Sequence, residues 1–482
     1  MVPLPQVDRR PEDGGGVDRI VGRPDELLAP LAPQAMLPQG DESPEDGDGD
    51  GVDWISGLPD EQLLQILARL GCAREAARTG VLSRRWRGLS TRLPAYTFHC
   101  VEPDKVEAAL AQVTRASLDR LHITAVLKSE AAIGQTSSLF RAAARLEPKT
   151  FSAALVMENG VDQAEDIELP CFHRTDSLRL DFCGVGFKLP PAGEFTELKS
   201  LNLATTRYAI PTALLPRCPS LRALRIHAYQ GLEVVSVSSA SLEELAVVED
   251  EFCVHDGFRR IDIAAPVVKE VTLEVAMAPD FSLSFSAQAV QKLDWNFICI
   301  TQTVGLPMWR LFALNYKLSH GVYTLRLRID CANSDDLPDR SFAQELERLP
   351  VAAFSVLELI IQTKGHAFGP LLVHLLQIRP AIQSLKLGLY ANKELCPEDC
   401  PCRQPIDWKH ENISLINLED VVINFKGRLT EQVDFLKLLF RCAPGLKCMK
   451  LAVSSDKDYE EICHVCEENP HVKCNVIRVY ST

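Results

Sequence analysis

The residues of this sequence that come nearest to a metal-binding pattern are cysteines and histidines near its C-terminus. Cys396, Cys400, Cys402 and His410 lie within one short stretch, and thiolate and imidazole groups are the usual ligands of zinc. Their spacing, however, does not match the paired Cys-x-x-Cys arrangement of common zinc sites. We therefore favour a group of thiols without a metal ion.

A second group has the same character. Cys463 and Cys466 form a single Cys-x-x-Cys, followed by His471 and Cys474, and no second matching pair accompanies it. Buried free thiols behave as small apolar groups. We expect no metal site and no cofactor in this chain.

Motifs for covalent catalysis are also missing from the sequence. It contains no Gly-x-Ser-x-Gly nucleophile elbow and no Gly-x-x-x-x-Gly-Lys phosphate loop. The basic cluster Arg84-Arg85-x-Arg87 suits a solvated or acidic-partner-facing surface better than a nucleic-acid patch. We expect a non-catalytic protein; a hydrolase built on an α/β sheet is the enzymatic alternative.

The charge of the chain excludes some partners. Its 482 residues carry a formal net charge of −14, which disfavours nucleic acid and anionic membranes as main partners. Twelve acidic residues and four arginines fall within residues 1–50, a Pro/Gly-rich stretch. Such a stretch buries too little apolar surface to offset its ordering entropy. We expect residues 1–50 to form a disordered acidic tail.

Two further observations indicate a location in the cytoplasm, the nucleus or both. The start of the chain lacks the apolar core and cleavage site of a secretory signal, and its cysteines are scattered, which fits a reducing compartment. No apolar run reaches the roughly 18–20 residues needed to span a bilayer. We expect no contact with membranes.

Helix signals begin after Asp53. Pro59 followed by two acidic residues predicts a helix N-terminus, and apolar residues then recur on one helical face until Gly71: Leu63, Ile66, Leu67 and Leu70. We predict a second helix over 74–79 and a third, capped by Ser83, that carries Trp86 and Leu89. Three helices in fewer than fifty residues make a marginal core. We therefore expect this unit to rely on a partner surface.

A repeat of the form Leu-x-x-Leu-x-Leu follows. Its central residues are separated by 23, 21, 26 and 22 positions, at or near the leucine-rich-repeat range of roughly 20–29: Leu201, Leu224, Leu245, Val271 and Leu293. Each unit ends in a short strand with one apolar face, which stacking of the units would bury. A generic buried sheet of an α/β domain is the alternative.

Weaker copies of the repeat extend the pattern in both directions, with central residues Leu121, Leu325, Leu357, Leu385, Val421 and Met449. The wider intervals between some of them, such as 32 positions between 293 and 325, predict inserted loops or helices. The Asn or Cys usual after the strand is also missing. We predict an irregular solenoid with a curved parallel sheet.

Residues 53–99 resemble a plant-type F-box. The resemblance rests on Leu58-Pro59-Asp60-Glu61, Ala76-x-Arg78-Thr79 and the run Val81-Leu82-Ser83-Arg84-Arg85-Trp86-Arg87. Ser90 departs from the pattern, since many relatives carry an aromatic residue there. The resemblance implies docking to a Skp-type adaptor, and through it to a cullin and a RING subunit. On the family pattern the adaptor-binding residues are Leu58, Pro59, Ile66, Leu67, Leu82, Ser83 and Trp86.

Intradomain packing is the alternative role at each of these positions. We favour packing for Leu63 and Leu70. For Pro59 and Trp86 we favour the interface, because a Trp with apolar neighbours is typical of interaction hot spots.

The C-terminal region carries a second resemblance, to the FBD region of plant F-box proteins. Its matching residues include Cys400-x-Cys402, Trp408, the run from Leu418 to Ile423, Asp434–Leu439 and Ala443–Leu446. The resemblances divide the chain into a tail (1–50), an F-box (53–99), a leucine-rich-repeat solenoid (100–395) and an FBD-like region continuing it (396–482). The implied fold class is α/β, with a short all-α three-helix F-box before the solenoid.

The function implied is that of a substrate-recognition subunit of a Skp-cullin-F-box ubiquitin ligase, which binds an as yet unknown target protein through its repeats. The main alternative is a non-catalytic leucine-rich interaction module outside the ubiquitin pathway. A receptor gated by a small molecule is a further variant, but no clustered basic pocket is visible in the sequence to favour it.

Overall fold

The computed structural model describes most of residues 57–479. Outside the described residues are 1–54, 56, 159–165, 206–212, 229–231, 250–256, 300–303, 332–339, 352–353, 380, 392–399, 401–406, 428–430 and 480–482. The predicted disordered tail lies entirely among them. The chain divides into two units, Met1–Gly57 and Leu58–Thr482, and the second unit is described here.

The fold is mixed α/β, with a large, mostly parallel sheet and eight α-helices in the described residues. No helix in this part of the chain is long and apolar enough to cross a membrane. The α-helices are α1 (Asp60–Ala68), α2 (Ala73–Arg78), α3 (Pro103–Leu110), α4 (Glu130–Arg145), α5 (Phe342–Arg348), α6 (Gly369–Ile378), α7 (Gln432–Cys442) and α8 (Asp456–Glu467). The 3₁₀ turns are η2 (Thr79–Val81), η3 (Leu89–Arg92), η4 (Leu215–Arg217) and η7 (Trp408–His410).

Most strands follow one another in the sheet in chain order. The first group is β1 (Ala95–Phe98), β2 (Arg120–Leu127), β3 (Thr150–Met157), β5 (Ser177–Cys183), β7 (Ser200–Thr205), β8 (Ala223–Ala228), β10 (Glu244–Glu249), β12 (Glu270–Ser286) and β13 (Lys292–Cys299). The second group is β16 (Val322–Cys331), β17 (Val356–Gln362), β18 (Ser384–Tyr390), β19 (Asp420–Lys426), β20 (Cys448–Val453) and β21 (Lys473–Arg478). Neighbours within each group are parallel.

The repeat predicted from the sequence is present as a register between strands. Its five central residues form one continuous row of paired positions across the sheet, in the order Leu201, Leu224, Leu245, Val271 and Leu293. The predicted strands are therefore confirmed, and the intervals of the repeat place equivalent residues side by side. All five side chains are buried, as their apolar character requires.

The interval between Leu293 and Leu325 holds a strand, β15 (Trp309–Ser319), so the prediction of a loop or helix was wrong at this place. β15 pairs antiparallel with β13 on one side and with β16 on the other, and also with β14 (Gly305–Leu306). A tight turn at His320 and Gly321 joins it to β16, and both residues have positive φ. Two adjacent apolar strands with a two-residue turn favour a hairpin over a helix.

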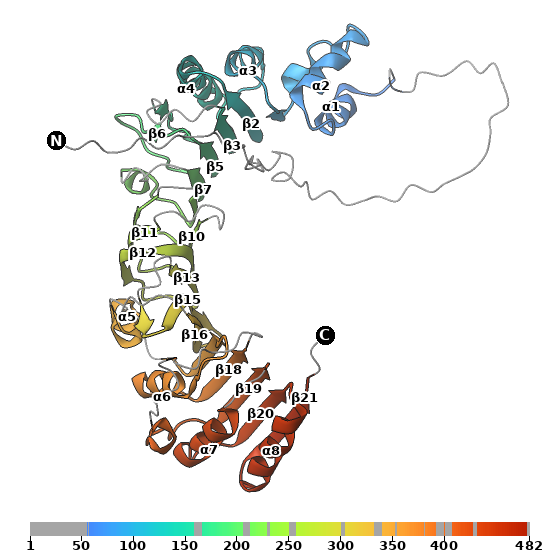
Figure 1. The fold of residues 1–482 in the computed structure, drawn as a ribbon. Helices are drawn as coiled ribbons and strands as arrows, with labels where there is room; N and C mark the ends of the chain where they lie inside the picture. Colours follow the sequence, from blue (N-terminus) through green and yellow to red (C-terminus); the bar gives the residue numbers. More distant parts are fainter. Residues whose placement is uncertain are drawn as a thin grey trace, which may run out of the picture. The chain divides into compact units, whose positions relative to one another are not determined.

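Helices fill the wider intervals nearer the C-terminus, as predicted. α5, α6, α7 and α8 each precede the next strand of the second group. Figure 1 shows α7 and α8 beside strands β19–β21 on one side of the sheet. Along β17 and β18 buried residues alternate with half-buried or exposed ones. Since alternate residues of a strand point to opposite faces, the face opposite these helices is not covered by a helix in the described residues.

In the middle of the unit, strands take the place of helices. β9 (Val234–Ser238) and β11 (Phe258–Ala264) pair with each other, and β11 pairs with the second half of β12. The first half of β12 pairs with β10 and β13, and its second half pairs with β11. The register between β11 and β12 shifts between Phe258 and Arg260. A separate two-stranded sheet is formed by β4 (Ile167–Glu168) and β6 (Phe187–Lys188).

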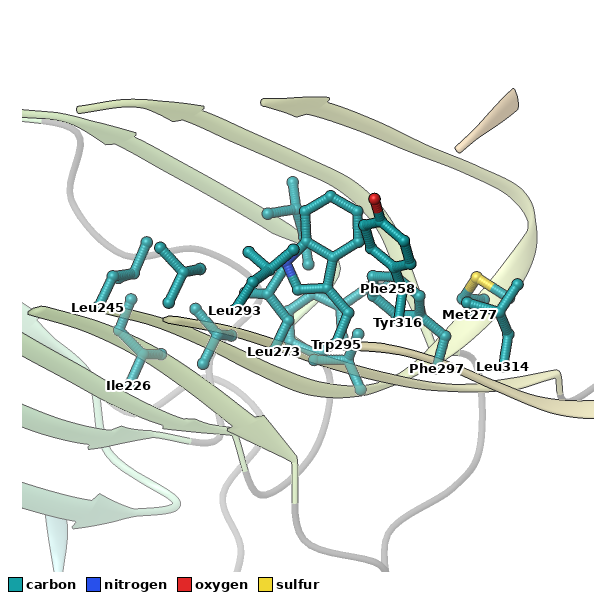
Figure 2. Close-up of a cluster of buried hydrophobic side chains, with 14 of the residues drawn as sticks. Ile226, Leu245, Phe258, Leu273, Met277, Leu293, Trp295, Phe297, Leu314 and Tyr316 are labelled. Atoms are coloured by element: carbon teal, nitrogen blue, oxygen red, sulfur yellow. The ribbon is translucent and has the colours of Figure 1, made fainter. Parts of the chain in front are cut away.

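One hydrophobic core runs through the unit from α1 to β21. Figure 2 shows its middle part, where Leu273 and Leu293 from neighbouring strands lie near the rings of Trp295 and Tyr316, with Leu245 farther along the same core. The two ring centroids are 5.5 Å apart. This aromatic cluster joins the parallel strands to the antiparallel hairpin.

Candidate partner-binding site in the N-terminal helical segment

The helical segment, residues 58–93, holds all the residues predicted to bind an adaptor. In its first helix, α1, Leu63 and Leu67 are buried, whereas Ile66 is 39% and Leu70 43% exposed. The preference for internal packing is thus confirmed for Leu63 and wrong for Leu70. The reason is local: α1 ends at Ala68, so Leu70 lies in the turn before Gly71, whose φ is +68°.

The predicted third helix is absent from this segment. Residues 84–88 form turns and η3 follows, while Ser83 makes no capping bond that the structure records. Gly88 has a φ of +83°, a conformation that no α-helix contains. Trp86 and Leu89 are nevertheless buried, at 7% and 2% exposure, so the turns place them in the core without a helix.

Charged groups fix this loop to the start of α1. The Asp60 carboxylate accepts hydrogen bonds from Arg85 Nε at 3.0 Å and Arg92 Nη1 at 3.1 Å. Arg85 also donates to the carbonyl of Leu58. The bonds from Arg85 and Arg92 hold the pKa of Asp60 below its usual value. Part of the basic cluster seen in the sequence is thus engaged within the chain.

Tyr96 on β1 closes the other end of the segment. Its hydroxyl donates to the carbonyl of Ser90 at 2.8 Å, and burial raises the pKa of Tyr96 to about 12. The segment is therefore packed onto β1 and the sheet.

The structure places the seven predicted residues in different environments. Pro59, Ile66, Leu82 and Ser83 are exposed, Leu58 is half-buried, and Leu67 and Trp86 are buried. For Trp86 we favoured a role in the interface, but the structure shows the side chain buried within the segment. Any effect of Leu67 and Trp86 on binding goes through the packing of the segment, while direct contact stays a prediction for the exposed residues.

The sequence reasoning missed the exposure of Val81 and Leu70, whereas Leu82 was among the predicted adaptor-binding residues. Val81 is 86% exposed and Leu82 67%, the highest values among the large hydrophobic residues described, and Leu70 belongs with them. The signal was available for Val81, because two consecutive apolar residues directly after Gly80 cannot both point into a small core. Within residues 58–82, four large apolar side chains thus face solvent: Ile66, Leu70, Val81 and Leu82.

No group of three or more potential metal ligands exists among the residues that the structure describes. Cys396 and Cys402 lie outside them, and Cys400 Sγ is 3.3 Å from His366 Nδ1. His410 is instead 2.6 Å from an oxygen of Asp407. Farther along, burial raises the pKa of the Cys466 thiol to about 12, which disfavours the thiolate that a metal would need.

No protein-family model matches the chain, and no curated protein matches it.

Proposed function

We propose that the chain is the substrate-recognition subunit of a Skp-cullin-F-box ubiquitin ligase. The observation that carries the proposal is the concentration of exposed apolar residues in the helical segment. Val81 and Leu82 expose more of their surface than any other large hydrophobic residue described. Exposed apolar side chains concentrated in one segment are typical of a surface completed by a partner, and these lie within the stretch that resembles an F-box.

The repeats supply the second half of the proposal. Equivalent residues of successive units pair along the sheet, which is the arrangement expected of an irregular leucine-rich-repeat solenoid. Such a surface would hold a target protein while the helical segment fixes that target near a charged conjugating enzyme. Proximity then makes lysine attack effectively intramolecular. The chain itself supplies no reacting group in this mechanism.

The test is co-purification with a recombinant Skp-type adaptor. The informative variant is Ile66→Ser/Leu82→Ser, because both side chains are exposed and their replacement leaves the core intact. Loss of two hot-spot residues at about 1–2 kcal/mol each predicts adaptor binding weakened by roughly 30- to 1,000-fold. The matched control is Val126→Ser/Val156→Ser, which removes apolar side chains that are 40% and 46% exposed from strands β2 and β3.

Equal binding by the two double variants would contradict the proposed interface. Absence of wild-type binding to the adaptor would favour the alternative, a leucine-rich interaction protein outside the ubiquitin pathway.

A further inference from the structure

The face of the sheet that no described helix covers carries a basic patch over strands β16–β20. Within this group of strands five cationic side chains point away from the buried side and are exposed: Arg326, Arg328, Lys386, Lys426 and Lys450. The acidic residues of the same face are Asp330, Glu358 and Asp420. An excess of positive charge here is notable because the chain as a whole carries −14.

The register places these side chains at regular intervals. Arg326 pairs with Glu358, Glu358 with Lys386, Lys386 with Val422, and Val422 with Lys450. Neighbouring strands lie about 4.8 Å apart, so this row crosses the sheet with a cation at three of its five positions. A ligand running across the strands would meet charge at intervals of about 10 Å.

Glu358 holds two of the cations in place. Its carboxylate accepts hydrogen bonds from Arg326 Nε at 2.6 Å and Lys386 Nζ at 2.7 Å. Burial raises its pKa, but the bonds from the two cations outweigh burial and lower it overall. Glu358 neutralises one charge and orders both side chains, whereas Lys450 has no ion pair with any residue described.

Aromatic rings accompany the other two cations. The Arg328 guanidinium lies 4.5 Å from the centroid of Phe312, and Lys426 Nζ lies 5.5 Å from that of Tyr390. Such contacts favour a defined position of the cation over the ring. Tyr390 in turn lies over Gly388, where an added Cβ would be 2.9 Å from the ring. Flat apolar surface therefore lies between the charged groups.

We propose that this basic patch binds an acidic, extended polypeptide segment of a partner protein. Carboxylates of the segment would meet Lys386, Lys450 and Arg328, and an apolar residue between them would lie on Tyr390. A nucleic acid fits less well, because Glu358 interrupts the cations and the net charge of the chain repels a polyanion. That this segment belongs to a ubiquitination target rests on the proposed function; the binding itself does not.

The test is fluorescence anisotropy with a labelled peptide of glutamates interrupted by tryptophan. The same peptide with glutamine for glutamate and a single-stranded DNA oligonucleotide of equal charge serve as comparison ligands. We expect salt-sensitive binding of the acidic peptide and loss of at least about tenfold in affinity for Lys386→Glu/Lys450→Glu, since like charges then face each other. The control Lys437→Glu/Lys457→Glu makes the same change of net charge on α7 and α8, and should keep wild-type affinity.

Equal losses in both variants, equal binding of the glutamine peptide, or tighter binding of the DNA would each overturn the proposal. The adaptor experiment separates it from the proposed function. The Lys386→Glu/Lys450→Glu variant should still co-purify with adaptor. If the wild-type chain binds the acidic peptide but no adaptor, the proposed peptide site stands and the proposed ligase function is rejected.

Discussion

Single residues in this protein often have a partner far along the chain, and Asp60 shows the effect at the surface. It begins α1, where an acidic residue is favourable. The residues next to it in the sequence do not predict its hydrogen bonds to Arg85 and Arg92. Those two bonds tie the turns that carry Trp86 to the first helix. The helical segment is thus held by charge as well as by its small core.

The lowered pKa of Asp60 gives a pH dependence. Because the pKa is lower in the folded state than its usual 3.8, ionised Asp60 stabilises the segment above that pH, and the contribution is lost as pH falls through the folded value. Asp60→Asn should therefore reduce hydrogen-exchange protection of α1 near pH 7. The difference from wild type should shrink below about pH 4; a difference independent of pH would contradict the ion pairs.

Trp295 is the largest fully buried side chain described, and its indole Nε1 has no hydrogen-bond partner in the structure. Replacement by Ala should cost about 3–5 kcal/mol in unfolding free energy. Trp295→Phe should cost much less, about 1–2 kcal/mol, because it keeps most ring contacts and removes an unsatisfied donor. Urea unfolding measures both, and equal losses would indicate that Nε1 has a partner after all.

At the scale of the element, helix α6 begins against residues far along the chain. The N-terminus of α6 is capped by Glu431, whose carboxylate accepts from the backbone N–H groups of Phe368 and Gly369 at 2.8 Å each. The other carboxylate oxygen accepts from Trp408 Nε1 at 3.2 Å. Trp408, a residue of the FBD resemblance, thereby packs against the first turn of α6.

This contact makes Gly369 sensitive to substitution. A Cβ there would lie 2.2 Å from Trp408 Cε2, so Gly369→Ala should destabilise the protein by about 1–3 kcal/mol through overpacking. The matched control is Gly134→Ala in α4, where no atom lies within 4 Å of the added Cβ. It should stabilise by about 0.5–1 kcal/mol, the ordinary helix preference for Ala. Thermal unfolding compares them, and opposite signs are the expected result.

Helix α5 shows the same dependence on distant residues. Ser341 and Gln344 form a capping box that starts it, as a local pattern can. Its position, however, depends on Arg348 and Arg340, which both donate to the carbonyl of Pro279 in β12. Glu345 lies between the two arginines, at 3.3 and 3.4 Å.

At the scale of the whole molecule, the described strands form a succession in which most have two neighbours. β8 pairs with β7 and β10, whereas β21 pairs with β20 alone among the described strands and is mostly exposed. Each strand in such an arrangement depends chiefly on its neighbours for stability.

Hydrogen exchange should therefore be fastest at the end of the succession. We expect amides of β21 to exchange at least about tenfold faster than those of β8, since local opening needs the loss of one ladder instead of two. Mass spectrometry of peptic fragments measures this. Equal protection of the two strands would show that β21 is covered by another surface in solution.

The sequence by itself determined the features that depend on periodicity. Helix α1, which stops before Gly71, and the five strands of the main repeat follow from local patterns of apolar residues and glycine, and the wider intervals predicted inserted loops or helices. These patterns are readable because burial of one face imposes a period of two on a strand and of 3.6 on a helix. The resemblance to an F-box likewise directed attention to the segment that proves rich in exposed apolar residues.

Only the tertiary structure decided which apolar residues are covered and which charges meet. Trp86 is buried by the turns and Gly88 that replace the predicted third helix, and Val81 is exposed at the end of the 3₁₀ turn η2. The antiparallel strand β15 was missed because strand direction is set by pairing, and apolar alternation is the same in both directions. The basic patch on β16–β20 contains residues up to 124 positions apart in the sequence. Local sequence patterns do not predict that such distant residues are neighbours, because only the register of the sheet places them side by side.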